Sequence, residues 1–379
     1  MENKYLRTLT SLRFFASILI VIHHLRDNFI PVLRGNEKFG ILGVTFFLVL
    51  SGFIIRYVYG PFKNLKESCY FLWNRVVRIY PLHLITLMIC LLYIIKQGFT
   101  LNARLVLINS LLLQSYFPLM KIYYSFNILS WSLSTLFFFY LLFSIANLKR
   151  QFFYFIVLIA IAGLIFSVYY IETNPLGQDT LFNFWLLYIF PPTRLVTILF
   201  GVGMCIIFKK YRRQWCARLG MVRGTLLETI SLLLVIDFFS WGYFTQFVQR
   251  VIVTLPINVS RSSYFLIPNY ITAPLPLLAL IFVFALEKGI FSRILQTRFC
   301  VYLGEMSFSL FIIHQILIAL FLNHYGKFLF SCFGQAATIL LVIIFIMLVA
   351  LLIYRYIEVP IRNRLRVTCT GESLRGSNL

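Results

Sequence analysis

The sequence lacks the polar segments from which a soluble domain is built. Only 12% of its 379 residues are charged, whereas 60% are hydrophobic. No polar stretch is long enough to fold as a domain of its own. A soluble core of this length cannot bury so much apolar surface. A soluble enzyme is therefore excluded, and any chemistry is expected within a membrane bundle or at its faces.

Cysteine and histidine are sparse, and their spacing carries no metal motif. The seven cysteines and five histidines include no Cys-x-x-Cys pair and no Cys/His spacing typical of a metal site. We therefore expect no metal. Acidic residues are few as well, with 12 Asp and Glu against 34 Lys and Arg. The basic residues lie at the ends of apolar blocks, which indicates membrane topology rather than nucleic-acid binding.

What the sequence has in abundance is apolar blocks of the length that crosses a bilayer. Blocks of about 20 residues alternate with short polar loops. They predict an all-α, polytopic transmembrane helical bundle of about ten spans: 9–27, 39–59, 79–95, 128–148, 152–171, 195–208, 226–243, 270–286, 302–322 and 335–356. A further run, 105–117, is too short to cross and is expected to form an interfacial or re-entrant helix.

The distribution of positive charge predicts the orientation of this bundle. With ten spans and a cytoplasmic N-terminus, 23 of the 34 Lys and Arg fall in cytoplasmic segments and 10 fall outside, while Arg13 lies within the first span. This bias satisfies the positive-inside rule and places both termini in the cytoplasm. We expect one membrane domain over residues 1–366 and a short cytoplasmic tail over 367–379.

The first span carries ionisable residues that are costly in a bilayer. Arg13 and His24 are eleven residues apart, which brings them to within about 20° of each other around a helix. His23 points about 80° away from them by the same count. The shared face should look into the protein or a wet cavity. The alternative is that Arg13 snorkels to one headgroup layer while His24 sits at the other.

Three other segments hold candidate residues with a structural alternative. Arg75 and Arg78 share a face at the cytoplasmic entry to span three, where they either anchor topology or grip phosphate. Ser51 precedes a glycine in an apolar run, a pattern that also allows close helix packing. His314 lies within span nine as either a catalytic group or a hydrogen-bonded core histidine.

Taken together, the sequence resembles the acyltransferase 3 family of integral membrane acyltransferases over about residues 6–364. The matching motifs occur in the family's order: Leu12-Arg13 with His24; Gly43-Val44, Phe46-Phe47 and Ser51-Gly52-Phe53; Arg75, Arg78, Ile79 and Pro81; Trp131-Ser132-Leu133; Leu303-Gly304, Ser307, Phe308, Ser309, Leu310 and His314; and Tyr356, Glu358 and Pro360.

The resemblance implies transfer of an acyl group, usually acetyl from acetyl-CoA, to hydroxyls of a bacterial surface glycan or lipid-linked sugar at the inner membrane. The expected partners are thus acyl-CoA, a glycan acceptor and the bilayer. His24 is the expected base, Arg13 a ligand of phosphate or of developing charge, and Arg75 and Arg78 the expected CoA-binding residues. Further candidates are His314, Ser51, Trp131, Ser307 and Glu358, the last expected to pair with a nearby arginine.

Two positions depart from the family pattern. Leu136 and Thr197 stand where the family usually has acidic residues, which leaves His24 as the main candidate base. One alternative is therefore a degenerate family member. A flippase or other transporter of lipid-linked glycan is a second alternative, although the sequence has no paired half-repeats. A glycan polymerase or glycosyltransferase is a third, but it would favour larger outer loops.

Overall fold

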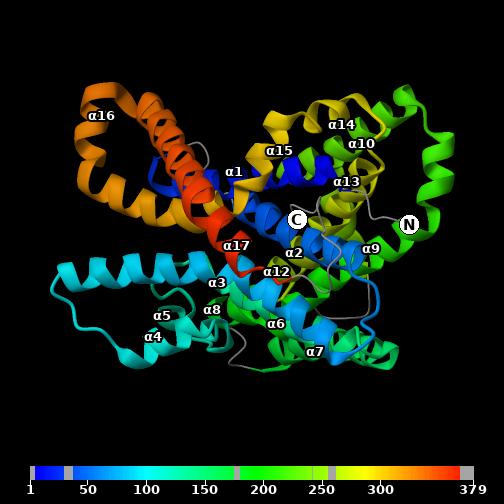
Figure 1. The fold of residues 1–379 in the computed structure, drawn as a ribbon, viewed down its shortest axis with the longest axis horizontal. Helices are drawn as coiled ribbons and strands as arrows, with labels where there is room; N and C mark the ends of the chain where they lie inside the picture. Colours follow the sequence, from blue (N-terminus) through cyan, green and yellow to red (C-terminus); the bar gives the residue numbers. More distant parts are fainter. Residues whose placement is uncertain (1–4, 30–36, 175–179, 241, 255–261, 368–379) are drawn as a thin grey trace.

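The chain folds entirely into helices in the part that the structure describes. The computed structural model describes residues 5–29, 37–174, 180–240, 242–254 and 262–367, and each regular element in these ranges is helical (Figure 1). The all-α prediction is therefore confirmed. Most of the predicted tail, residues 368–379, lies outside the described residues, and the domain boundary at residue 366 stays a prediction.

The helices follow the apolar blocks of the sequence. They are α1 (Arg7–Phe29), α2 (Lys38–Val58), α3 (Leu65–Lys96), α4 (Ala103–Ser110), α5 (Met120–Tyr123), α6 (Ser130–Ala146), α7 (Arg150–Thr173), α8 (Thr180–Phe184), α9 (Pro191–Arg218), α10 (Met221–Ser240), α11 (Tyr243–Thr254), α12 (Ser263–Ile267), α13 (Pro274–Leu286), α14 (Ile290–Leu295), α15 (Arg298–Glu305), α16 (Ser307–Ile353) and α17 (Val359–Leu365). Short π-helical turns at Trp185–Ile189, Pro268–Thr272 and Tyr354–Glu358 adjoin α8, α12 and α16.

Each of the ten predicted spans falls on a helix, and most of these helices are long enough to cross a bilayer. Among the described residues seven helices have the length and hydropathy of a span, and the pair α15 and α16, bent by 53°, makes an eighth. α6 has only 17 residues, and α10 carries three charged residues. The chain is thus a multi-pass helical bundle, and the count of ten stays a prediction.

Three helices extend or break differently from the predicted spans. α3 begins at Leu65 rather than at residue 79, and α9 continues to Arg218 rather than ending at 208. Lys, Arg, Glu and Gln are good helix formers, so a helix can continue past its apolar block. The basic cluster 209–213 therefore lies on a helix, not in a loop. α16 is broken at Gly334, whose φ of 73° is left-handed. Predicted span nine falls on α15 and the first arm of α16, which continues past residue 322, and predicted span ten falls on the second arm.

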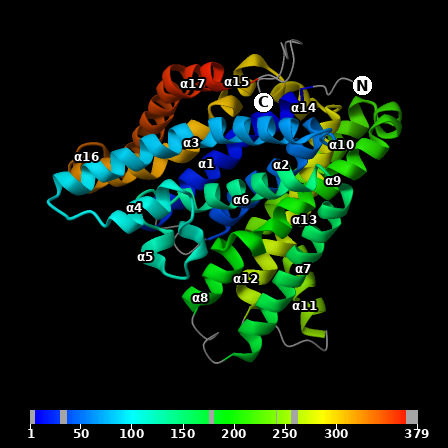
Figure 2. The same ribbon diagram turned by 60° about the horizontal axis from the view of Figure 1, so that its bottom comes forward.

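Glycines bring two of the central helices, α2 and α9, into close contact. A Cβ at Gly52 of α2 would clash with the Ile198 carbonyl of α9, and one at Gly201 would clash with the Val49 carbonyl of α2. The close-packing role weighed for the Ser51-Gly52 pair therefore holds for its glycine. α1 packs against α2, α15 and α16, while α3 crosses in front of α1 and α16 (Figure 2). These contacts fix the helices whose side chains form the site.

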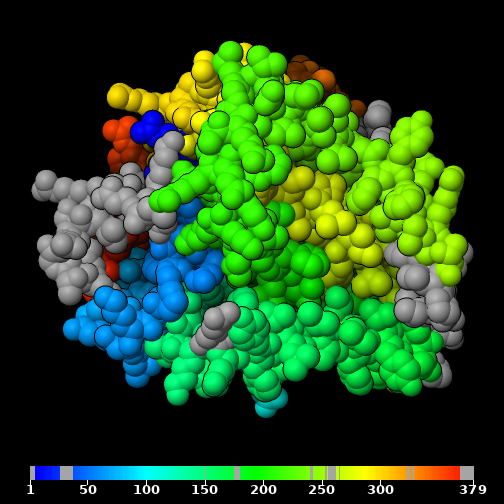
Figure 3. Space-filling model, turned by 90° about the vertical axis from the view of Figure 1, so that its right-hand side faces the viewer, coloured from blue at the N-terminus to red at the C-terminus, as the bar shows by residue number. Residues whose placement is uncertain are grey.

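The periphery of the bundle is apolar, as a lipid-facing surface should be. α7 exposes large apolar side chains along most of its length, among them Leu158, Ile165 and Phe166. Figure 3 views one such face, with α7 along its lower edge and α9 and α10 above it. Only 11% of the most apolar stretch of α7 is buried, against 72% for α2. α2 is thus a central helix and α7 a peripheral one.

A buried carboxylate ties α10 to the beginning of α14. Glu228 is 1% exposed and accepts hydrogen bonds from the backbone N–H groups of Gly289, Phe291 and Ser292 at 3.0, 3.0 and 3.3 Å, and from the Ser292 hydroxyl. These are orphan donors of a helix N-terminus, which a carboxylate satisfies well.

Glu228→Ala should lower the free energy of unfolding by about 3 kcal/mol or more, because it leaves several buried donors without an acceptor. The measurement is thermal unfolding of the detergent-solubilised protein. Thr229→Ala is the matched control, since the Thr229 hydroxyl bonds only to the Thr225 carbonyl of the same helix. Equal unfolding temperatures for the two variants would contradict a stabilising role of the Glu228 hydrogen bonds to α14.

Candidate active site

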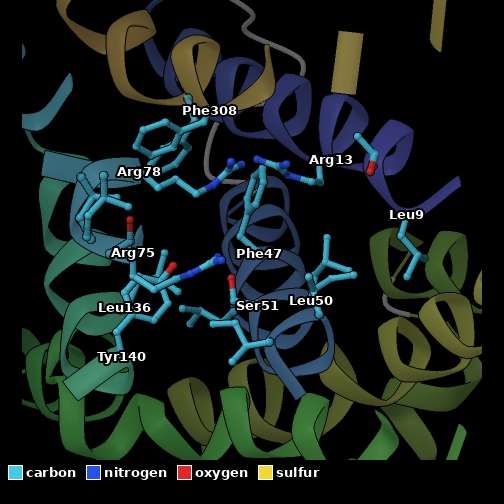
Figure 4. A pocket seen from close by; sticks show the side chains of 18 of the residues that line it. Leu9, Arg13, Phe47, Leu50, Ser51, Arg75, Arg78, Leu136, Tyr140 and Phe308 are labelled. Carbon is cyan, nitrogen blue, oxygen red and sulfur yellow. The ribbon is translucent and has the colours of Figure 1, made fainter. Parts of the chain in front are cut away.

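Three arginines from two helices converge on one cavity. This arginine cavity has a volume of about 120 Å³ and is lined by side chains of α1, α2, α3, α6 and α16. Arg13 comes from α1, and Arg75 and Arg78 come from α3. Figure 4 shows the guanidinium groups of Arg13 and Arg78 facing each other, with that of Arg75 pointing toward Ser51. The arginines are therefore not confined to a surface anchoring role.

None of the described residues that line the arginine cavity is acidic. Glu358 does not line it, but interacts electrostatically with both Arg13 and Arg78. The Glu358 carboxylate also accepts a 2.7 Å hydrogen bond from Ser309 and lies 3.6 Å from Arg362, which confirms its expected pairing with an arginine. The single Glu358 carboxylate thus interacts with Arg13, Arg78 and Arg362. It cannot neutralise all of them, so the cavity retains positive charge suited to an anionic ligand.

Arg75 is held in place by aromatic groups rather than by an acid. Its Nη2 donates a 3.0 Å hydrogen bond to the Tyr59 hydroxyl. Its guanidinium lies 5.5 Å from the Tyr59 ring centroid and 5.7 Å from that of Phe71, while its Nε has no hydrogen-bond partner in the structure. Aromatic faces stabilise the planar cation and leave donors for a ligand.

A second, larger cavity is lined by two histidines. This histidine cavity has a volume of about 660 Å³. His23 and His24 of α1, with Glu37 and Lys38 next to them, supply its charged and titratable groups. The rest of its wall is largely apolar and includes seven aromatic residues: Tyr123, Tyr124, Trp131, Phe184, Tyr188, Phe265 and Phe311. Burial raises the pKa of Tyr124 well above its usual range, so this phenol stays neutral.

The structure brings His24 and His314 together, although 290 residues separate them. Their ring centroids are 5.3 Å apart. His314 is fully buried, and its Nδ1 lies 3.1 Å from the Leu310 carbonyl. A carbonyl only accepts, so Nδ1 carries the proton and Nε2, which has no partner in the structure, keeps its lone pair. The hydrogen bond of Nδ1 thus fits the interpretation of His314 as a core histidine. Its Nε2 remains available to accept a hydrogen bond near His24.

His23 also lines the histidine cavity, on the side of α2. Its ring centroid is 5.0 Å from that of His24, its Nε2 lies 3.9 Å from the Glu37 carboxylate, and its ring packs against Gly40. The rotation per residue of an α-helix predicted that His23 lies off the face that carries Arg13 and His24. The two histidines do turn toward different helices, His24 toward α16 and His23 toward α2, yet the cavity wall includes both.

The two cavities adjoin. Val44, Ser132 and Phe311 belong to the walls of both. Arg13 and His24 lie on either side of this shared wall, separated along α1 by about 16 Å. The eleven-residue spacing therefore places one residue in each cavity.

The remaining candidate residues divide between the cavities and the core. Ser51 lines the arginine cavity, and Trp131 lines the histidine cavity with its ring 5.0 Å from that of Tyr188. Ser307 is buried outside both walls, and its carbonyl accepts a 3.0 Å hydrogen bond from Ser17. Leu136, one of the two departures from the family pattern, lines the arginine cavity and makes its wall apolar where a carboxylate was expected.

Sequence reasoning did not predict the burial of Arg194. This residue is one of the ten basic residues assigned to the outer side by charge, and the structure shows it fully buried near the beginning of α9. Its guanidinium lies 5.2 Å from the ring centroid of Tyr188 and 5.6 Å from that of Tyr270, and it donates to Asn269 and Thr45 at 3.5 and 3.4 Å. The preceding pair of prolines indicates a helix start, which was the available signal for its inward placement.

The fold and the two adjoining cavities define a multi-pass membrane protein with a candidate site inside the helical bundle. The chain belongs to the acyltransferase 3 family, since the family model described as an acyltransferase domain matches residues 6–355. It is also similar to the acyltransferase MdmB of Streptomyces mycarofaciens, with 29% identity over 339 residues that cover 83% of this chain and 79% of that protein. No solved structure matches the chain.

Proposed function

We propose that this membrane acyltransferase is an O-acetyltransferase that moves acetyl from cytoplasmic acetyl-CoA to a hydroxyl of a bacterial surface glycan, such as O-antigen, lipopolysaccharide or exopolysaccharide. The observation that carries the proposal is the wall shared by an arginine cavity and a histidine cavity. On one side of this wall, the arginines could bind an anionic acyl donor. On the other side, a histidine could take a proton from the acceptor. The site is proposed to lie in the inner membrane.

The donor end of this site is the arginine cavity. A CoA thioester carries phosphates, and guanidinium groups bind phosphate through paired hydrogen bonds. With both termini in the cytoplasm, as the charge bias favours, the arginine cavity is nearer the cytoplasmic side of α1. Arg75 and Arg78 would hold phosphate, and Arg13 would hold phosphate or stabilise charge on the thioester oxygen.

The acceptor end is the histidine cavity. Its aromatic wall offers flat apolar faces of the kind that pack against sugar rings, and its volume admits a ligand much larger than acetyl. A neutral His24 would take the proton of the attacking hydroxyl. Transfer to the hydroxyl directly and transfer by way of an acyl-histidine both use this residue.

The test combines a purified protein with a deletion strain. Protein reconstituted in lipid should release free CoA from acetyl-CoA in the presence of membrane glycan extract. The glycan of the parent strain should be heavier than that of the deletion strain by one acetyl group in place of hydrogen per modified unit. A glycan that changes location without a change in mass, with no CoA release, would instead support a transporter.

The donor assignment predicts a selective effect of charge-preserving substitutions. Arg75→Lys and Arg78→Lys keep a positive charge but lose the forked geometry that grips phosphate. Each should raise the apparent KM for acetyl-CoA by about tenfold, with a smaller change in kcat. The measurement is CoA release at varied donor concentration. An unchanged KM in both variants would return the two arginines to a purely topological role.

A further inference from the structure

The wall that the two cavities share comes from three helices. Val44 belongs to α2, Ser132 to α6 and Phe311 to α16. They are 8%, 6% and 7% exposed, and each lines both cavities. No residue of α1 belongs to the shared wall, so Arg13 and His24 flank it without forming it.

The shared wall is uncharged. The Ser132 hydroxyl donates a 2.9 Å hydrogen bond to the Leu129 carbonyl, so its proton is already engaged. Phe311 is the largest group of the three. Its ring centroid lies 5.7 Å from that of Phe47, which lines the arginine cavity, and 6.2 Å from that of His314, which contacts His24. The Phe311 ring thus lies between the arginine cavity and the histidine pair His24 and His314.

From this arrangement we propose that Val44, Ser132 and Phe311 form an acyl port, and that the Phe311 ring limits the length of the acyl chain that is transferred. The proposal rests on the proposed function. A charged phosphate is strongly disfavoured in an apolar passage, whereas a short neutral acyl group is not. The port therefore passes the acyl end of the thioester while Arg75 and Arg78 retain the CoA phosphates.

The reaction at the port exchanges one bond for another. The acceptor hydroxyl oxygen, in the histidine cavity, attacks the thioester carbonyl carbon at the port. The new C–O bond forms and the C–S bond breaks. The hydroxyl proton passes to His24 and then to the thiolate, which leaves as free CoA thiol. The port supplies no proton and no charge, and its role is to admit and orient the acyl group.

Widening the port should change acyl-chain preference. We expect Phe311→Ala to raise the ratio of hexanoyl to acetyl transfer by about tenfold or more, since each methylene accommodated in an apolar pocket is discriminated to this degree. Membranes that hold the protein and its own acceptor are given radiolabelled acetyl-, butyryl- or hexanoyl-CoA, and label in the glycan fraction is counted. Phe308→Ala is the matched control. Phe308 lies one turn away on α16 with 8% exposure but lines only the arginine cavity, so its variant should keep the wild-type ratio.

Narrowing the port gives the complementary result. Val44→Phe should reduce acetyl transfer by on the order of 100-fold. It should leave the CoA-induced rise in unfolding temperature intact, because the arginines are untouched. This binding measurement also shows that each variant is folded.

Three results would overturn the port. The first is a ratio of hexanoyl to acetyl transfer in Phe311→Ala that equals the ratio of the parent protein. The second is a Phe308→Ala variant whose ratio changes as much as that of Phe311→Ala. The third is full acetyl transfer by a folded Val44→Phe variant. Failure of the proposed function itself looks different, because the parent protein would then transfer none of the three acyl groups.

Discussion

His24→Ala is expected to abolish acyl transfer while leaving the protein inserted and folded. It removes the proposed base from the wall of the histidine cavity, and loss of a general base typically lowers a rate by about 10²- to 10⁴-fold. The expected damage to folding is small because His24 is only partly buried. The measurement is the O-acetyl content of the surface glycan, normalised to the amount of protein extracted from the membrane.

The neighbouring histidine is the control for this result. His23→Ala should keep most of the activity, because its ring is directed toward Glu37 and Gly40 of the α2 end and not toward His314. The two side chains have the same chemistry, adjacent positions and a shared cavity, so a nonspecific effect on the cavity would damage both variants. An inactive His23→Ala beside an active His24→Ala would transfer the role of base to His23.

Arg13→Ala should be nearly as severe, with an expected loss of about 10²- to 10³-fold in kcat. Arg13 faces Arg78 in the arginine cavity and shares the Glu358 carboxylate with it (Figure 4). Its removal takes away positive charge where the thioester oxygen becomes negative. Arg13→Lys should recover only part of the loss, because an ammonium group lacks the planar fork. The measurement is CoA release by the reconstituted protein at saturating donor.

Arg7→Ala is the matched control for Arg13. Arg7 is a basic residue of the same helix, but it is exposed and lies outside both cavities. Its variant should retain its activity. Comparable losses in the two variants would mean that α1 needs positive charge for insertion and not for chemistry.

The helices were predictable because helix formation within an apolar block depends on the local sequence. An apolar block of span length must form its backbone hydrogen bonds internally, so α2, α7 and the second arm of α16 lie close to their predicted bounds. The errors come from polar residues that continue a helix. The stretch from Leu65 to Arg78 carries too many polar residues for a span, yet it is helical, because Asn64 caps its first turn and Phe71 packs into the core.

The site was predictable only where one helix carries it. Periodicity along α1 was enough to place Arg13 and His24 on walls of the bundle interior. It gave no information on the contact of His24 with His314, nor on the sharing of Val44, Ser132 and Phe311, because these depend on how α2, α6 and α16 pack. Arg194 was missed for the same reason. A basic residue at the edge of an apolar block is typical of a loop, and only the packed rings of Tyr188 and Tyr270 show it to be buried.

The continuity of α1 also has a thermodynamic consequence. One unbroken helix carries a residue of each cavity, and it packs against α2, α15 and α16 along its length. A donor that displaces Arg13 on binding would also displace His24, because both residues belong to the same helix. Linkage then requires reciprocity: if bound CoA changes the affinity for the glycan by some factor, bound glycan changes the affinity for CoA by that same factor. We expect the two substrates to bind interdependently, with a coupling set by how stiffly α1 is held.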